Sequence, residues 1–196
     1  MCLISFGQKN EYKQALVLSN NKNHIESNVI LVKLLNNEFG LIDNETCYFI
    51  LYTIAENYHG LKDFQNMSDY YNLTIDFGKK NHMNEESLKD ITRLSELNNI
   101  FLEFTKALNF LDNKNYYVSN MFFQKLLNND FGVPENEDQC KFLVNIGINY
   151  EGLKNYKSSF EFYNKAIDFS KKNHVLEDLV SDISKKAEIV KINIIN

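Results

Sequence analysis

The sequence of 196 residues contains little that breaks helices or crosslinks chains: one proline, seven glycines, three cysteines and no tryptophan. Scarce proline and glycine favour helices joined by short turns, because these two residues interrupt a helix most strongly. The cysteines, Cys2, Cys47 and Cys140, show no CxxC spacing, and an odd, unpaired set suits a reducing compartment. We therefore expect a helical, cytoplasmic protein without disulfides.

Long apolar runs and concentrated positive charge are also missing. No apolar stretch approaches the roughly 18 residues of a membrane span, and the N-terminus lacks the charged-then-apolar layout of a signal peptide. The net charge is −5, and no run of lysine and arginine occurs. We therefore do not expect a membrane as a partner, and we do not expect this chain by itself to bind a nucleic acid.

Motifs of enzymes are missing as well, with no glycine-rich phosphate loop, no HExxH and no GxSxG. The four histidines, His24, His59, His82 and His174, are dispersed rather than paired at ligand spacing. His82 and His174 each follow Lys-Lys-Asn at a predicted helix end, where the backbone dipole favours a cation. We expect no catalytic residue, no metal site and no cofactor.

An internal duplication is present. Three segments recur at one constant offset (126 − 34 = 92): residues 34–40 at 126–132, residues 57–62 at 149–154, and residues 79–82 at 171–174. Three ungapped matches at one offset make chance implausible. We predict a single domain, 1–196, that is duplicated over about 9–98 and 101–190, with two helical pairs in each copy.

Apolar spacing shows how one such pair is built. Leu143, Ile146, Gly147 and Tyr150 fall on one helical face at i, i+3, i+4 and i+7. The stretch 152–155 breaks this pattern, which resumes on a second helix from Phe160. Gly147 is a small residue in a bulky face, as is Ser159 in the second helix, and we expect both to let the two helices approach closely.

Similar spacing predicts the remaining helices, over 9–19, 24–35, 45–59, 64–80, 85–98 running on into 99–111, 116–127, a fourth pair entered at 134–137, and 176–194. The last helix is predicted to cover the end of the core with one face, formed by Leu176, Leu179, Val180, Ile183, Ala187 and Val190. The stripe of Phe101, Phe104, Leu108 and Leu111 is interpreted as a buried seam rather than a ligand groove.

The order of large, small and aromatic positions in one pair resembles the tetratricopeptide (TPR) pattern; the positions are Leu143, Ile146, Gly147, Tyr150, Tyr156, Ser159, Tyr163 and Ala166. This resemblance covers nearly the whole chain and implies an all-α fold. The implied architecture is a right-handed superhelical array of about four antiparallel helix pairs plus a C-terminal capping helix.

The resemblance also implies a concave groove lined by the first helix of each pair. The groove residues would be those that the core does not use: Lys13, Asn20, Phe49, Tyr52, Glu56, His59, Leu102, Thr105, Asn109, Lys141, Val144 and Ile148. Amide side chains can pair with a peptide backbone, and aromatic walls can bury its side chains. An ordinary solvated face is an equally good interpretation of this mixture.

The segments 75–81 and 167–173 look, more narrowly, like repeats of the Rap, NprR, PlcR and arbitrium receptors. That resemblance implies binding of a short secreted peptide and dimerisation through the repeats. DNA-binding members carry an N-terminal helix-turn-helix, and none is evident before the first repeat here. The leading hypothesis is thus a non-enzymatic, quorum-sensing-type peptide receptor or adaptor of a bacterium or phage, and the alternative is a constitutive protein–protein scaffold.

Overall fold

The structure, a computed structural model, describes residues 6–40 and 42–195. In this part of the chain all regular structure is helical, apart from one isolated bridge between Asp130 and Gly132. The helices are α1 (Phe6–Asn20), α2 (His24–Leu35), α3 (Asn44–Gly60), α4 (Phe64–Lys80), α5 (Glu85–Asp112), α6 (Tyr116–Leu127), α7 (Asn136–Gly152), α8 (Tyr156–Asn173) and α9 (Glu177–Ile195).

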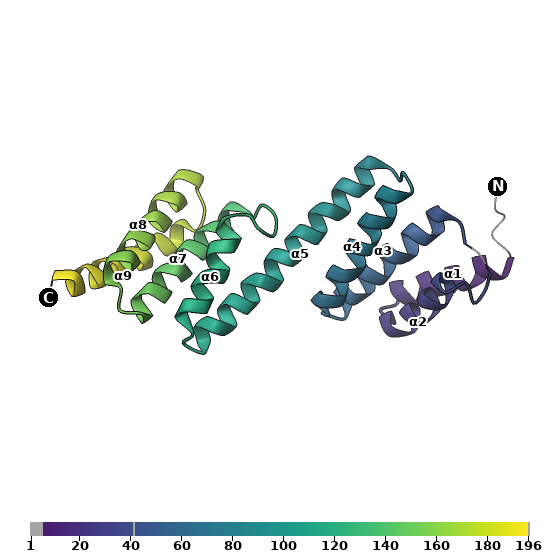
Figure 1. Cartoon of the computed structure of the whole chain (residues 1–196), viewed down its shortest axis with the longest axis horizontal. Helices are drawn as coiled ribbons and strands as arrows, with labels where there is room; N and C mark the ends of the chain where they lie inside the picture. The colour runs from purple at the N-terminus through teal and green to yellow at the C-terminus, as the bar shows by residue number, and fades with distance from the viewer. Residues whose placement is uncertain (1–5, 41, 196) are drawn as a thin grey trace. The chain divides into compact units, whose positions relative to one another are not determined.

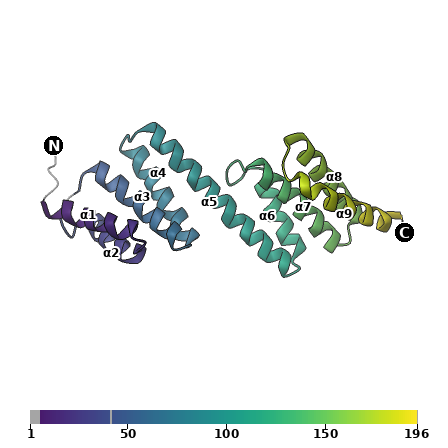
Figure 2. The same ribbon diagram turned by 180° about the vertical axis from the view of Figure 1, so that it is seen from behind.

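The chain divides into two compact units, Met1–Asn98 and Asn99–Asn196, which we call unit one and unit two. The boundary falls within helix α5, so the first part of α5 belongs to unit one and its second part to unit two. Within each unit, two antiparallel helix pairs are followed by a further helix that packs on the second pair, as Figures 1 and 2 show. This arrangement confirms the predicted all-α, TPR-like fold of helix pairs. The prediction of a single domain stays a prediction.

The predicted helices are all present, with small shifts at their ends. Helix α1 begins at Phe6 rather than Lys9, and α5 runs unbroken through 28 residues, as the pattern suggested. Asp43 caps α3, because its carboxylate accepts a hydrogen bond of 2.7 Å from the backbone N–H of Thr46. Pro134 lies just before the N-cap of α7, where its missing N–H costs no helical hydrogen bond.

The turns repeat between the units as closely as the helices do. Left-handed residues other than glycine follow helix ends in matched pairs: Lys22 and Lys114, Asn37 and Asn129, Lys62 and Lys154, and His82 and His174. A left-handed residue at this point lets its N–H bond to a carbonyl of the last helical turn. His82 and His174 share a φ of 54°, so their repetition follows this backbone geometry as well as the favourable helix dipole.

The cores of the two units use the same contacts. The hydroxyl of Ser27 donates to the carbonyl of Ala15 at 2.8 Å, and that of Ser119 donates to the carbonyl of Ala107 at 2.9 Å. Stacked rings also recur, with centroids 5.6 Å apart in the Tyr58–Tyr70 pair of unit one and in the Tyr150–Phe162 pair of unit two. The helix pairs of both units are therefore held by one packing scheme.

Gly147 confirms the predicted close approach of α7 and α8. A methyl group on this residue would lie 2.7 Å from Cδ1 and Cε1 of Tyr163, a ring that is fully buried. Ser159, the other small position, is fully buried as well. Small residues at these two points allow the helix axes to come together.

Two predicted core residues are exposed instead. Phe101 is 46% exposed, because the buried face of this part of α5 passes through Ile100 and Ala107, one position out of the predicted register. Leu179 is also 46% exposed, whereas Ile183, Ala187 and Val190 of α9 are buried as predicted. The predicted seam and the predicted face of the last helix were each wrong at one residue.

Two cysteines lie in the described part of the chain, and both are free: Cys47 is half-buried and Cys140 is buried. Cys2 lies outside the described residues. None of the helices described combines the length and apolar character needed to cross a membrane.

Candidate functional site

A groove lies at the same place in both units, between the first helix of the second pair and the helix that follows that pair. Groove one lies between α3 and the first part of α5, has a volume of about 190 Å³, and is lined by Tyr48, Phe49, Tyr52, Ser87, Asp90, Ile91 and Leu94. Groove two lies between α7 and α9, has a volume of about 310 Å³, and is lined by Lys141, Val144, Asn145, Leu176, Leu179, Asp182, Ile183 and Lys186.

Helix geometry explains why the grooves form there. Ile91 and Ile183 are buried at 5% and 4% exposure, and each anchors its helix to the second pair. Residues one position before and three positions after such an anchor stand at the edge of the contact. Asp90 and Leu94 therefore form one rim of groove one, and Asp182 and Lys186 form the matching rim of groove two.

Groove one is mainly aromatic. The rings of Tyr48 and Phe49 meet edge to face with centroids 5.5 Å apart, and Phe49 is 45% exposed. The Tyr52 ring is tilted against the buried Tyr71 ring at 6.3 Å. These contacts hold Phe49 against the buried Tyr48 and Tyr52 against Tyr71 of α4, and they leave Phe49 and Tyr52 partly exposed to the groove.

A carboxylate supports these rings from behind. The hydroxyl of Tyr71 donates to Glu56, and burial together with this hydrogen bond raises the pKa of Tyr71. Burial also raises the pKa of Tyr52, and the charge of Glu56 raises it further. Both tyrosines are therefore neutral hydrogen-bonding groups at physiological pH.

Groove two is more basic. Lys141 pairs with Glu137 at 2.7 Å and with Asp138 at 3.4 Å, both on its own helix. Lys186 stands on the opposite rim, on α9. Between them lie the aliphatic side chains of Val144, Leu176 and Leu179. The matching position therefore offers apolar and positively charged surface in unit two, in place of aromatic surface in unit one.

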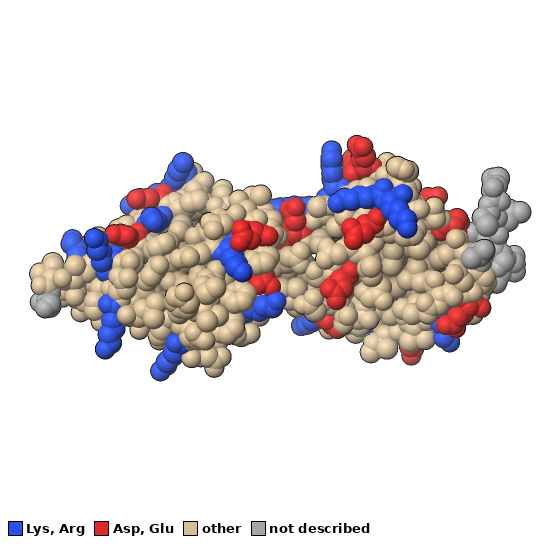
Figure 3. Space-filling view, in the orientation of Figure 1, with Lys and Arg blue, Asp and Glu red and all other residues tan. Residues whose placement is uncertain are grey.

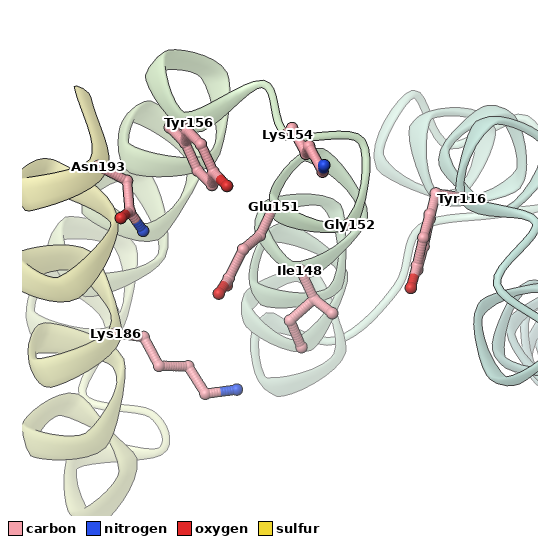
Figure 4. A pocket seen from close by; sticks show the side chains of 8 residues that line it. All are labelled: Tyr116, Ile148, Glu151, Gly152, Lys154, Tyr156, Lys186 and Asn193. Carbon is pink, nitrogen blue, oxygen red and sulfur yellow. The ribbon is translucent and has the colours of Figure 1, made fainter. Parts of the chain in front are cut away.

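A larger hollow of about 500 Å³ adjoins groove two; we call it the end hollow (Figure 4). Its lining residues are Tyr116, Ile148, Glu151, Gly152, Lys154, Tyr156, Lys186 and Asn193. Figure 4 shows the side chains of Glu151 and Lys186 extending toward the same space from α7 and α9. Glu151 accepts a hydrogen bond of 2.8 Å from the hydroxyl of Tyr163. Lys186 lines both spaces, so groove two and the end hollow are neighbours.

Five of the twelve groove residues predicted from the sequence line these three spaces. Phe49 and Tyr52 line groove one, Lys141 and Val144 line groove two, and Ile148 lines the end hollow.

Glu56 lies behind groove one, and His59 is exposed near the ring of Phe64. The remaining predicted residues lie on α1 and the second part of α5 and line none of these three spaces: Lys13, Asn20, Leu102, Thr105 and Asn109. Among the three spaces described, the predicted residues that line them all come from the first helix of the second pair, α3 or α7.

The sequence-based reasoning missed the rim supplied by the helix after each second pair. Asp90, Leu94, Asp182 and Lys186 belong to this rim, as does Leu179, which was predicted to be buried. The signal was available in the constant offset, since 90 and 182, like 94 and 186, are matched positions. A helix treated only as a cap offers no reason to examine its edges.

The charged side chains of the described residues form no metal-binding cluster. In the described residues, no group of three or more His, Cys, Asp and Glu side chains could hold a metal ion. On the face shown in Figure 3, acidic and basic side chains are interspersed among large neutral areas. The arrangement is suited to contact with another molecule through mixed apolar and charged surface.

No protein family model matches the sequence, and no curated protein matches it. Among solved structures, the chain is similar to PlcR of Bacillus thuringiensis, determined with the peptide PapR7 and DNA, at 16% identity and a TM-score of 0.38 over 93% of this chain and 69% of that one. It is also similar to a MamA RS-1 ArsTM double mutant, at 11% identity and a TM-score of 0.35 over 96% of this chain and 97% of that one. A third similar structure is a putative kinesin light chain of Podospora anserina with TPR-like repeats, at 8% identity and a TM-score of 0.39 over 96% of this chain and 97% of that one. Likenesses at this level carry no inference about function.

Proposed function

We propose that the chain is a non-enzymatic interaction protein that binds a short extended peptide, or a segment of a partner protein, in grooves one and two. The observation that carries this proposal is the recurrence of a groove at the same position of both units with different lining chemistry. A repeated shape offers repeated docking points, and the differing rims allow each point to select a different side chain.

Packing does not account for the chemistry of the rims. Ile54 and Ile146 are matched core positions, both fully buried, and both are isoleucine. At the rim, Phe49 is matched by Lys141, Tyr52 by Val144, and Leu94 by Lys186. The fold therefore accepts aromatic, aliphatic or charged side chains at these positions, which leaves them available for recognition.

The size of the grooves favours side chains of a peptide over a free small molecule. Drug-sized ligands occupy pockets of about 300–1,000 Å³ that enclose most of their surface. Groove one, at about 190 Å³, is smaller than that range, and groove two is at its lower end. An extended segment that inserts single side chains into shallow grooves matches this geometry.

The finer form of the proposal is a peptide sensor in which the ligand changes the population of conformations or of dimers. A ligand can do this only to the extent that it binds one state better than another. The narrower resemblance of segments 75–81 and 167–173 to bacterial and phage peptide receptors motivates this form.

A constitutive scaffold is the second candidate, and an apolar surface outside the grooves favours it. Ile25, Val29 and Leu61 are exposed around a hollow of about 450 Å³ between α2 and the end of α3. The matched positions of unit two, Tyr117, Met121 and Leu153, are also exposed. A stable protein partner covering such surfaces would bury about 1,200–2,000 Å² in total.

Selection of phage-displayed random heptapeptides on the full chain, followed by fluorescence anisotropy with the selected peptides, tests the proposal. We expect Tyr52→Ala to weaken binding about tenfold, the effect of losing one well-packed aromatic contact. Tyr117→Ala is the matched control, since Tyr117 is 69% exposed and lies outside the grooves. Loss of binding in Tyr117→Ala alone would assign the peptide to the outer apolar surface and contradict the proposal.

A further inference from the structure

We infer that groove one recognises a positively charged side chain, arginine or lysine, of the bound peptide. This inference rests on the proposed function and adds to it the chemical class of one ligand residue. Three features of the groove support it: its charge, its rings and an unpaired buried hydroxyl.

The charge of groove one has a single sign. Asp90 is exposed on one rim, and none of the lining residues is basic. Glu56 lies one helical turn beyond Tyr52 and adds a second carboxylate behind the rings. A cation that entered the groove would thus meet negative charge from two helices, α3 and α5.

The rings supply the second feature. Tyr48, Phe49 and Tyr52 all line the groove, and a cation within about 6 Å of an aromatic face is attracted by the ring quadrupole. Ile91 and Leu94 complete the wall. Long aliphatic stems pack well on such surface while the charged head stays near the rim, which favours arginine or lysine over a compact cation.

The hydroxyl of Tyr48 is the third feature. Tyr48 is 3% exposed, and its hydroxyl has no hydrogen-bond partner among the described residues. Burial raises the pKa of Tyr48, and the charge of the nearby Asp90 carboxylate, which stands on the opposite wall of the groove, raises it further. An unpaired buried hydroxyl is unfavourable, and a guanidinium group carries five donors, enough to serve a hydroxyl and a carboxylate together.

Groove two supplies a control built into the chain. Lys141 occupies the position of Phe49, Lys186 that of Leu94, and Cys140 that of Tyr48. The carboxylate is retained as Asp182, and the buried isoleucine as Ile183. Groove two thus has the same backbone geometry without the rings and with two cations, and it should disfavour the side chain that groove one accepts.

The test selects phage-displayed random heptapeptides on the full wild-type chain and on the double variant Phe49→Lys, Leu94→Lys. Both substituted residues are surface-exposed, at 45% and 37%, so the variant should fold, and circular dichroism checks this. We expect arginine or lysine at one fixed position of the peptides selected by the wild type, and loss of that preference in the double variant.

A selected peptide is then titrated into Asp90→Asn and into the matched control Asp76→Asn, which removes the same charge from an exposed site on α4. We expect Asp90→Asn to weaken binding about tenfold, less so at high salt, and Asp76→Asn to leave it unchanged. Replacement of the basic peptide residue by citrulline should have the same effect as Asp90→Asn.

Selected peptides without a fixed basic residue, or equal affinities of the two aspartate variants, would overturn the inference and leave the proposed function standing. Failure of every version of the chain to select any peptide would overturn the proposed function, and the inference with it. Binding of the citrulline peptide at full strength would show that the groove recognises the shape of the side chain rather than its charge, which also overturns the inference.

Discussion

Both units have a buried asparagine at the same repeat position, Asn57 or Asn149, but its hydrogen-bond partners differ between the units. In unit one, Asn57 is fully buried and makes four side-chain hydrogen bonds. Its carbonyl accepts from Ser19 at 2.6 Å and contacts Nδ1 of His24 at 3.0 Å, and its amide donates to Ser27 at 2.9 Å and to Asn28 at 2.7 Å. This network joins α1, α2 and α3 through one side chain.

In unit two, the matched residue Asn149 is also fully buried, yet among the described residues its amide donates to Ser119 alone, at 2.9 Å. Its side-chain oxygen has no partner within the described part of the chain. Leu111 and Tyr116 stand where unit one has Ser19 and His24, so the two groups that donate to Asn57 are replaced. Unit two therefore keeps the buried amide and loses most of its partners.

Comparing the two units shows which contacts the packing of the helix pairs requires and which can vary without changing the fold. The Ser27 and Ser119 contacts, the stacked rings and the left-handed turns are common to both units. The polar network and the groove rims differ. The common features thus specify the helix pairs, and we expect the features that differ to set the stability of each unit and, under the proposed function, its binding preference.

The largest expected effect comes from truncating the two asparagines. Asn57→Ala should destabilise the chain by about 3 kcal/mol, because it removes four hydrogen bonds and leaves buried partners unpaired. Asn149→Ala should cost about 1 kcal/mol, since only one bond is lost. Urea denaturation measures both values, and hydrogen exchange shows which unit opens. Equal losses would show that the network of unit one adds no stability.

Gly147 and Ala55 are also matched positions, and exchanging them tests the close approach of the helices. Gly147→Ala should destabilise unit two by about 2 kcal/mol, although alanine is the better helix former, because its methyl group would collide with the buried ring of Tyr163. Ala55→Gly should cost about 1 kcal/mol through helix propensity and lost contacts. Thermal denaturation distinguishes these values from the stabilisation of about 1 kcal/mol that propensity alone predicts for Gly147→Ala.

The helices could be predicted from the sequence because their signals are local. Apolar spacing predicted each of the described helices to within a few residues at its ends, and the aspartate at 43 marked the start of α3 correctly. The register of α5 was wrong at Phe101, since one long helix changes its buried face along its length and the repeat pattern is weakest there.

The candidate site was harder to predict because it depends on the packing of separate helices. Phe49, Tyr52, Lys141 and Val144 were found as residues that the core does not use. The opposite rims were missed, since nothing local in the segment around Asp90 shows which helix it faces. Lys13 and Asn109, from the first pair of each unit, were included on the same rule, and they line neither groove one nor groove two.

Two buried tyrosines give a test at high pH. The pKa of Tyr71 and that of Tyr163 are raised by burial and by hydrogen bonds to Glu56 and Glu151. Below pH 10 both states of the chain keep these groups protonated. Above pH 10 the unfolded state ionises first, so folding stability falls as the pH rises. The urea midpoint should therefore drop between pH 9 and 11, and less so in Tyr71→Phe and Tyr163→Phe.

Tyr117→Phe serves as the control for this titration, because Tyr117 is 69% exposed and should keep the full drop. The two carboxylates come from different repeat positions, since Glu151 is matched by His59 and not by Glu56. If the drop in the urea midpoint shrinks equally in Tyr71→Phe and Tyr163→Phe, a carboxylate at either repeat position stabilises the buried hydroxyl equally well. If the drop shrinks in only one variant, the two units differ in this feature too.

The smallest expected effect is that of exchanging the rims. The double variant Phe49→Lys, Lys141→Phe places each side chain in the other unit at a matched, partly exposed position. We expect the free energy of unfolding to change by less than about 0.5 kcal/mol, because surface ion pairs such as that of Lys141 with Glu137 contribute little. Urea denaturation measures this change. A fall in the free energy of unfolding of more than about 2 kcal/mol would show that the rim residues contribute to the packing of each unit. The rims could then not be treated as free to vary for recognition.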